Sequence, residues 1–468
     1  MPTVAPPPST PPEVVADVVV VGAGACGLTA ALAAADRGVE VIVLERDASP
    51  SGSTAMSSGF VPAPATRFQR AIGVTDDGPE RLTADIIAKS HGTSDARLAR
   101  LAASTIGEAV EWLADAASCD WQVLDGFLYP GHSRHRMHAV GEKTGAALMT
   151  RLLAAAEAAD ATLVTEATAE TLHREDDGRI TAVTVTRPGG VTETIGCRAL
   201  VLASSGYGGN RAMVERHIPE IAAGPYYGHA GNTGHAVSWG EALGAELDHL
   251  SGYQGHGSLA HPHGILISWA LVMRGGVQLN ADGLRFSDES AGYSEQATKV
   301  LAQPSAVAWT VFDEERHAFA MEGFADYREA VAAGAVRRGE DVDALAAATG
   351  LPMEALAGTL AEVERLASRG GTDEFGRSFA GLAPLAPPYR AVKVTGALFH
   401  TQGGLVIADE GRVRRASGGS FPNLYAGGGA ACGVSGPSVD GYLSGNGLLT
   451  AIAFGYLSGR NAAALARR

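Results

Sequence analysis

The feature that most constrains the fold of this sequence is a glycine-rich turn that directly follows a run of four valines. Val18 to Val21 form an all-apolar run, as a strand buried on both faces requires. Gly22, Gly24 and Gly27 follow in the spacing G-x-G-x-x-G. Glycines so spaced permit a tight turn, close approach of the backbone to a pyrophosphate, and packing of a helix on the strand. We therefore expect a strand, a nucleotide-binding turn and a helix over residues 28–37.

The residues after this turn complete a nucleotide-binding unit. Gly38 is expected to end the helix, and residues 39–44 form a second strand that leads to Glu45, 18 residues after Gly27. A carboxylate at that place accepts hydrogen bonds from a ribose 2′-hydroxyl and repels a 2′-phosphate. The unit therefore predicts FAD or NAD as the ligand and argues against NADP.

The composition limits the classes of function. With 36 Lys and Arg against 51 Asp and Glu, the chain has a net charge of −15, which disfavours nucleic acid and anionic membrane surfaces as partners. The four cysteines are scattered, without the short spacings typical of zinc sites, attached haem or disulfide frameworks. No uninterrupted apolar run reaches the roughly 18 residues of a membrane span, so we expect a cytoplasmic protein.

Three later segments are also rich in glycine and small hydroxylated residues. They are SGSTAMSSG (51–59), LVLASSGYGGN (200–210) and a long stretch, 422–459, that begins PNLYAGGGAACG. Together with the first unit they resemble the fumarate reductase and 3-ketosteroid dehydrogenase flavoprotein superfamily, over about residues 17–459. One departure is Gly429, where that superfamily usually has an acid, so one ribityl contact is expected to be absent or replaced.

The resemblance implies a fold and a cofactor. The implied fold class is α/β, a Rossmann-like FAD-binding domain with an inserted α+β substrate-capping domain. The FAD is expected to be non-covalent, because loop 51–59 lacks the histidine to which flavinylated relatives attach theirs. The residues predicted to bind it are Gly22, Gly24, Ala25, Gly27, Glu45, Arg46, Gly52, Ser53, Thr54, Ser57, Ser58, Gly59, Ala203, Gly206, Gly428, Asn446, Gly447 and Leu448.

Domain limits follow from shifts in residue pattern along the 468 residues, a length that suits two or three domains. Residues 1–14 are rich in proline and predict a flexible tail. Residues 15–254 and 400–468 are assigned to the FAD-binding domain, and 255–399 to the capping domain, where charged helices are expected at 313–348 and 352–369.

The candidate catalytic positions mix two subfamilies. HTQGG (400–404) resembles the fumarate reductase hinge motif, which implies that His400 holds a substrate carboxylate, with His256 as a second such histidine. The two arginines of the reductase pattern are absent, and Tyr293 and Tyr442 stand at those motif positions. Both resemble tyrosines of the ketosteroid dehydrogenases, in which one removes a proton next to a ketone and the other polarises the carbonyl together with a backbone amide, here near Gly445 or Gly447.

A basic cluster, GFLYPGHSRHRMH (126–138), stands apart from these motifs. Arg134 and its neighbours are expected to face a carboxylate and to supply the positive charge that would lower the pKa of Tyr293. A solvated loop is the alternative reading of the same residues.

These features predict an FAD-dependent α,β-dehydrogenase of a small cyclic ketone, with a keto acid such as 4-oxocyclohexanecarboxylate as one candidate substrate. The electron acceptor could be a quinone, an electron-transfer flavoprotein or oxygen. Three alternatives stay open: a soluble fumarate-type or enoate reductase, a 3-ketosteroid dehydrogenase, and a flavin-binding protein without activity.

Overall fold

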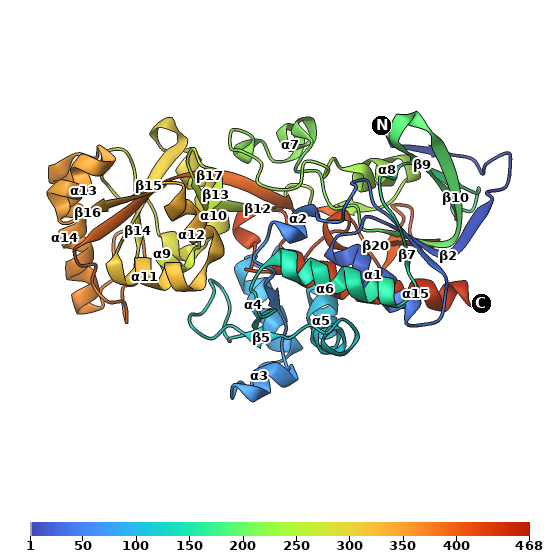
Figure 1. Cartoon of the computed structure of the whole chain (residues 1–468), viewed down its shortest axis with the longest axis horizontal. Helices are drawn as coiled ribbons and strands as arrows, with labels where there is room; N and C mark the ends of the chain where they lie inside the picture. The colour runs from blue at the N-terminus through green and yellow to red at the C-terminus, as the bar shows by residue number, and fades with distance from the viewer. Residues whose placement is uncertain (1) are drawn as a thin grey trace.

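A sheet lies near each end of the molecule, and both chain termini lie towards the same end (Figure 1). The computed structural model describes residues 2–468. The sheet beside the termini contains the four valines, and the other is built from residues between 253 and 401.

The centre of the first sheet is the predicted strand, β2 (Val14–Val21). It pairs in parallel with β3 (Val41–Leu44) on one side and β10 (Thr192–Leu202) on the other. β7 (Thr162–Val164) continues the parallel order beyond β3, and β20 (Ser420–Ala426) pairs in parallel with β10. Residues 18–21 are buried on both faces, which explains why the run has no polar residue.

The remaining strands extend this sheet or form small sheets beside it. β8 (Thr168–Arg174), β9 (Ile180–Thr186) and β10 are antiparallel neighbours, and β19 (Arg412–Arg414) pairs with β20. The small sheets are β4 (Val61–Pro62), β6 (Met137–Ala139) and β5 (Gln122–Val123), and the pair β11 (Leu247–Asp248) and β18 (Gly404–Leu405).

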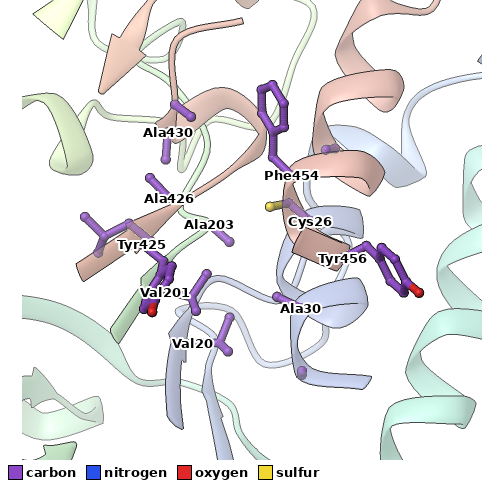
Figure 2. Packing of buried hydrophobic residues seen from close by; sticks show 14 of the residues in the cluster. Val20, Cys26, Ala30, Val201, Ala203, Tyr425, Ala426, Ala430, Phe454 and Tyr456 are labelled. Atoms are coloured by element: carbon purple, nitrogen blue, oxygen red, sulfur yellow. The ribbon is translucent and has the colours of Figure 1, made fainter. Parts of the chain in front are cut away.

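Two helices, α1 (Ala25–Ala35) and α15 (Asn446–Ala466), lie in close contact behind the sheet. Glycines on α15 permit this approach, since a Cβ at Gly455 would lie 2.5 Å from the Cys26 carbonyl oxygen and one at Gly459 only 2.1 Å from that of Ala30. Figure 2 shows Cys26 and Ala30 in this tightly packed region. The contacts advance in the same direction along both helices, so both N-termini point the same way.

The structure corrects two expectations about the N-terminal part of the chain. The helix predicted over 28–37 spans 25–35 instead, because Gly24 already serves as its N-cap and Asp36 ends it. The predicted flexible tail contains a strand, β1 (Thr3–Ala5), which pairs in parallel with β8. The three residues of β1 follow Pro2 and precede the proline run, so their backbone is free to pair while Val4 packs against the core.

Seven further α-helices lie between β3 and β11 along the chain. They are α2 (Gly52–Ala55), α3 (Arg67–Ala71), α4 (Pro79–Lys89), α5 (Ala96–Ala116), α6 (Gly145–Ala158), α7 (Arg211–His217) and α8 (His235–Leu243).

The second sheet has the order β13 (Ile265–Leu266), β12 (Tyr253–Ala260), β17 (Tyr389–Thr401), β15 (Val307–Asp313) and β14 (Val277–Leu279), with β16 (Val336–Gly339) also paired to β17. Its helices are α9 (Ala270–Met273), α10 (Tyr293–Leu301), α11 (Glu314–Gly323), α12 (Ala325–Ala332), α13 (Val342–Thr349) and α14 (Met353–Arg369). The helical segment expected over 313–348 therefore consists of three helices and a strand. Gly323 is the last residue of α11, and Gly334, which has a positive φ, follows α12.

Candidate functional site

One continuous cavity runs between the first sheet and the second. The glycine-rich turn after β2, the loop that contains α2 and the N-terminus of α15 line one part of it. The end of β17, the start of α10 and residues of β12 line the other part. The cavity therefore joins the predicted cofactor residues to the predicted catalytic residues.

The glycine-rich turn has the geometry that a dinucleotide needs. A Cβ at Gly27 would lie 1.8 Å from the Gly22 carbonyl oxygen, so only glycine lets α1 pack on the turn. Gly24 caps α1 without any side-chain hydrogen bond, which leaves the start of the helix open to a phosphate. Glu45 lies in the cavity wall, where its carboxylate accepts hydrogen bonds from the N–H groups of Ala23 (2.9 Å) and Asp47 (3.0 Å).

The loop 51–59 crosses the start of α1 and is fixed from both sides. The Thr54 hydroxyl accepts a hydrogen bond from the Ala25 N–H at 3.3 Å. The Ser53 hydroxyl accepts one from the His229 N–H at 3.1 Å and one from the Asn232 side chain at 2.9 Å. Small residues in this loop thus leave room for a ligand while their hydroxyls and backbone remain available to it.

Most residues predicted to bind the cofactor line the cavity. Those in its wall are Gly22, Gly24, Ala25, Glu45, Arg46, Gly52, Ser53, Thr54, Ser57, Ser58, Gly59, Ala203, Gly428, Gly447 and Leu448. Gly27, Gly206 and Asn446 lie behind the wall, where Gly27 packs on the turn and a Cβ at Gly206 would lie 1.9 Å from the Thr401 hydroxyl oxygen.

The sequence reasoning missed several residues of the wall. Ser204 and Ser205 follow β10 after Ala203, and Thr168 and Ala169 lie at the start of β8. The first pair could have been found from LVLASSG, since parallel strands present their carboxyl ends to the ligand. Nothing in the sequence around Thr168 marks it as part of a site.

The two predicted catalytic tyrosines meet at the other end of the cavity. The rings of Tyr293, the first residue of α10, and Tyr442 have their centroids 6.1 Å apart at an interplanar angle of 60°. The Tyr442 hydroxyl accepts a hydrogen bond from the Gly447 N–H at 3.3 Å. Gly445 caps α15 with φ = 85°, a conformation that favours glycine. The backbone N–H groups at the N-terminus of this helix lie beside both rings.

The ionisation of the two tyrosines is governed by burial. Burial raises the pKa of Tyr293 to about 12, although hydrogen bonds to the Ser444 side chain, the Gly445 backbone and the Tyr442 hydroxyl act in the opposite direction. Burial and the neighbouring Tyr293 raise the pKa of Tyr442 further. Of the pair, Tyr293 is therefore the group that ionises first, and both carry their protons at neutral pH.

His400 lies next to Tyr442 at the end of a relay of buried side chains. The centroids of the His400 and Tyr442 rings are 5.5 Å apart. Asn446 donates to the Ser435 hydroxyl (2.9 Å), and Ser435 donates to the Gln402 carbonyl oxygen (2.7 Å). The Gln402 amide then donates to Nδ1 of His400 at 3.2 Å. Asn446 thus supports His400 and lies outside the cavity wall.

This relay and burial together keep His400 neutral. The Gln402 amide nitrogen, 3.2 Å from Nδ1, can only donate, and it lies nearer than the Thr401 carbonyl oxygen at 3.5 Å, so we assign the imidazole proton to Nε2. Burial lowers the pKa of His400 to about 4. Burial also lowers the pKa of His256 to about 3, and its Nδ1 accepts a hydrogen bond from the Ser258 N–H at 3.1 Å. Neither histidine carries a positive charge at neutral pH.

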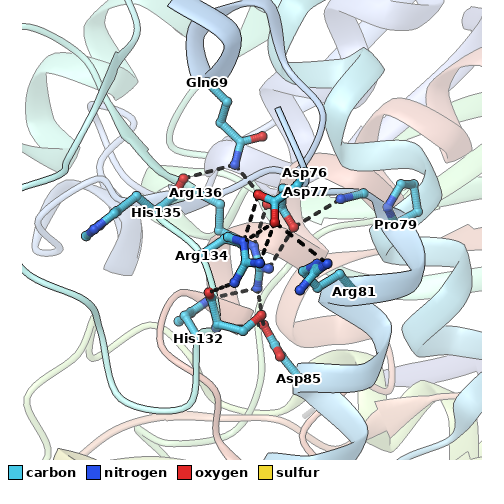
Figure 3. Close-up of polar contacts among 12 residues, drawn as sticks. Gln69, Asp76, Asp77, Pro79, Arg81, Asp85, His132, Arg134, His135 and Arg136 are labelled. Carbon is cyan, nitrogen blue, oxygen red and sulfur yellow. Dashed lines mark hydrogen bonds and ion pairs between the residues drawn. The ribbon is translucent and has the colours of Figure 1, made fainter. Parts of the chain in front are cut away.

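The basic cluster does not face the cavity, and the expectation that Arg134 contacts the substrate is wrong. Figure 3 shows the cause, which is a group of carboxylates on the loop before α4 and on α4 itself. Arg134 donates from Nε to both carboxylate oxygens of Asp76, at 2.8 and 3.0 Å. Arg136 is fully buried between Asp77 (2.8 Å) and Asp85 (2.5 Å). The positive charges are thus neutralised within the cluster.

One member of the cluster does reach the catalytic end. His132 lies between Arg136 (3.2 Å from Nδ1) and the Ser444 carbonyl oxygen (2.9 Å from Nε2). Since Arg136 can only donate, Nε2 of His132 carries the proton and donates it to Ser444. The cluster therefore holds the segment before α15 in place and supplies no charge to Tyr293.

Few charged side chains line the cavity. Over residues 2–468 its wall contains one arginine, Arg46, and no lysine. Arg46 donates to the Gly231 carbonyl oxygen at 2.6 Å, beside Glu45 and Asp47. The remaining carboxylate of the wall is Asp326, on α12 of the second sheet's domain.

Residues 2–468 contain no group of three or more His, Cys, Asp and Glu that could hold a metal ion. None of their helices combines the length and the apolar character that crossing a membrane requires.

Comparison with known proteins agrees with this geometry. Residues 17–448 match the model of a family described as FAD binding domain. The chain is 29% identical to a probable fumarate reductase of Shewanella frigidimarina, over 97% of this chain and 75% of that protein. It is 25% identical to a 4-oxocyclohex-2-ene-1-carboxylate 5-dehydrogenase of Sinomonas cyclohexanicum, over 96% and 94% of the two chains.

A solved structure shows the same overall fold. The crystal structure of a 3-ketosteroid-Δ4-(5α)-dehydrogenase from Rhodococcus jostii RHA1 superposes with a TM-score of 0.78 at 25% identity, over 99% of this chain and all of the other. The expected α/β flavoprotein fold and the FAD cofactor are confirmed. The chain belongs to the FAD binding domain family, and it is an FAD-dependent oxidoreductase that acts on carbon–carbon single and double bonds.

Proposed function

We propose that this chain catalyses the α,β-dehydrogenation of a cyclic ketone that carries no carboxylate. The observation that carries the proposal is the meeting of Tyr293 and Tyr442 at the N-terminus of α15, in a part of the cavity without a cation. A ketone needs a base for its α-proton and hydrogen-bond donors where charge develops on oxygen. These two residues and the nearby backbone offer that combination.

The two tyrosines are suited to different steps. Tyr442 accepts a hydrogen bond from the Gly447 N–H, and its own proton, which is directed to the Tyr293 hydroxyl, would turn to a substrate carbonyl when a ketone binds. Tyr293 has the lower pKa of the pair and, once ionised, removes the α-proton. The Nε2–H of His400 is a further donor beside Tyr442. Bound FAD supplies the acceptor for the hydride that leaves the β-carbon.

A carboxylate on the substrate is disfavoured by the charges of the site. Among the described residues 2–468, those that line the catalytic end include two neutral histidines but no arginine or lysine. No cation there would therefore pair with an anion. A desolvated carboxylate without a counter-charge is costly. A keto acid such as 4-oxocyclohexanecarboxylate is therefore the weaker candidate within the ketone class.

The reverse reaction is a second candidate that one observation favours. With a pKa of about 12, Tyr293 carries its proton at neutral pH, and a protonated tyrosine is ready to deliver a proton to the α-carbon of an unsaturated ketone. Reductive use of the same site would agree with the similarity to a fumarate reductase. Fumarate itself, with two carboxylates, is disfavoured by the charges described above.

The test is to mix the oxidised holoenzyme anaerobically with cyclohexanones, keto acids and their methyl esters, and to follow flavin bleaching. We expect ketones and esters to bleach the flavin faster than the free keto acids. A second series uses chemically reduced enzyme with cyclohexenones and fumarate. Rapid reoxidation by fumarate together with no bleaching by any ketone would contradict the proposal and favour a fumarate-type reductase.

A further inference from the structure

A row of stacked rings leads from the catalytic tyrosines towards α12. His256 stacks on Tyr293 with centroids 4.9 Å apart, and it also stacks on Phe399 at 5.1 Å. Tyr227 continues the row at 4.9 Å from Phe399. All four side chains line the cavity. The row therefore forms an extended aromatic wall, long enough for a ligand of more than one ring.

A carboxylate lies at the far end of this row. Asp326 is the second residue of α12 and lines the cavity together with Phe324 and Leu266. α12 packs against β13 (Ile265–Leu266), and the backbone of Leu266 forms a hydrogen bond with Tyr227, so the helix that carries Asp326 lies beside the last ring of the row. The cavity thus has its ketone-binding groups at one end of the aromatic wall and an acid at the other.

Asp326 has no partner within the described residues 2–468. Burial and the neighbouring Glu329 raise its pKa, and no hydrogen bond or cation acts in the opposite direction. A half-buried carboxylate that receives no donor from the protein keeps its hydrogen-bonding capacity for a ligand, and pairing it with a donor offsets the cost of its partial desolvation. Its place in the first turn of α12 gives it only a modest benefit from the helix dipole.

We propose that Asp326 binds a hydrogen-bond donor, a hydroxyl or a protonated amine, at the end of the substrate remote from its ketone. The substrate is then an elongated ketone of at least two rings that lies along Tyr293, His256, Phe399 and Tyr227. This inference rests on the proposed ketone chemistry only for the orientation of the ligand. The donor specificity of Asp326 itself is a property of binding.

The experiment compares three ligands of equal length with the oxidised holoenzyme. They are 4-cyclohexylcyclohexanone, its analogue with a hydroxyl at the remote 4′-position, and the corresponding 4′-amine. Dissociation constants are obtained from the perturbation of flavin absorbance and, independently of turnover, by calorimetry. A hydrogen bond to a charged group predicts binding of the hydroxyl compound roughly 10- to 100-fold tighter than that of the unsubstituted ketone.

Variants assign the preference to one residue. Asp326→Asn keeps the size of the side chain and should reduce the preference for the hydroxyl and abolish any additional preference for the amine. Asp326→Ser serves as a second variant, since serine is well tolerated near a helix start. Glu329→Gln is the matched control, because it removes one charge from the same helix at an exposed position outside the cavity wall and should keep the preference for the hydroxyl and the amine compounds.

The outcomes separate this inference from the proposed function. Equal binding of the three ligands to the wild type, with only a lower melting temperature in the Asp326 variants, would show that the acid merely stabilises α12 and would overturn the inference. Bleaching by these ketones in that case would leave the proposed function intact. A donor preference lost in both Asp326 variants supports the inference even if no ketone bleaches the flavin.

Discussion

If Tyr293 is the base, the reaction should become faster as the pH rises. The pKa of about 12 implies that at pH 7 only about one molecule in 10⁵ has Tyr293 ionised, a cost of about 7 kcal/mol. Below the pKa the ionised fraction increases tenfold per pH unit. The rate of flavin reduction by a ketone should therefore rise about tenfold per unit between pH 7 and 9.

The assay is anaerobic stopped-flow reduction of the enzyme-bound flavin at saturating ketone, with Tyr293→Phe as the variant. Phenylalanine keeps the ring that stacks on His256 and removes the proton acceptor. We expect the rate to fall by roughly 10²–10⁴-fold and to lose its dependence on pH. Reoxidation of reduced enzyme by an unsaturated ketone should be flat over the same range, because Tyr293 is protonated throughout.

Two results would refute this reasoning. A wild-type rate of flavin reduction that does not change between pH 7 and 9 would mean that no group with a pKa near 12 has to ionise. A Tyr293→Phe variant that reduces flavin at the wild-type rate would mean that the base is another residue. FAD content and melting temperature, measured in parallel, show whether the variant is folded.

Four further predictions concern other parts of the cavity. Tyr442→Phe should slow flavin reduction by on the order of 10²-fold, less than the loss of the base, since the Gly447 N–H remains as a donor; a loss larger than that in Tyr293→Phe would exchange the two roles. Glu45→Ala should weaken FAD binding by about 1–3 kcal/mol in a titration of apoprotein, and an unchanged constant would mean that Glu45 makes no ribose contact. Acid precipitation should release all yellow colour, whereas colour retained in the pellet would show a covalent link. Gln402→Leu removes the donor to Nδ1 of His400 and should lower kcat with little change in FAD content; equal kinetics would make the relay dispensable.

The parts of the fold that depend on local sequence patterns were predictable. The run 18–21, the glycine spacing and Glu45 specify strand, turn and second strand within thirty residues, and the structure has them in that order. The strand Thr3–Ala5 could not be predicted, because its pairing with β8 depends on a contact more than 160 residues away. The domain limits at 254 and 400 stay a prediction.

The site shows the same division between local and distant information. Tyr293, Tyr442 and His400 lie in recognisable motifs, and the cavity brings them together. The basic residues at 132–138 were misjudged because their partners, Asp76, Asp77 and Asp85, lie some fifty residues earlier and only the fold brings them close. Asp326 lies in an ordinary amphipathic helix, and nothing in the sequence sets it apart from other surface acids.

The continuity of β17 has a consequence for the dynamics of the enzyme. This strand pairs with β15 and β16 in the second sheet and ends at Phe399, His400 and Thr401, where the Thr401 hydroxyl accepts a hydrogen bond from the Tyr207 N–H. If flexible linkers joined the second sheet to the first, the second sheet could move without disturbing the residues around the substrate. Because β17 is one continuous paired strand that reaches His400, a tilt of the second sheet would also displace the His400 imidazole. Amide hydrogen exchange in β17 and in the residues around Tyr207 should therefore slow down together when a ligand fills the cavity.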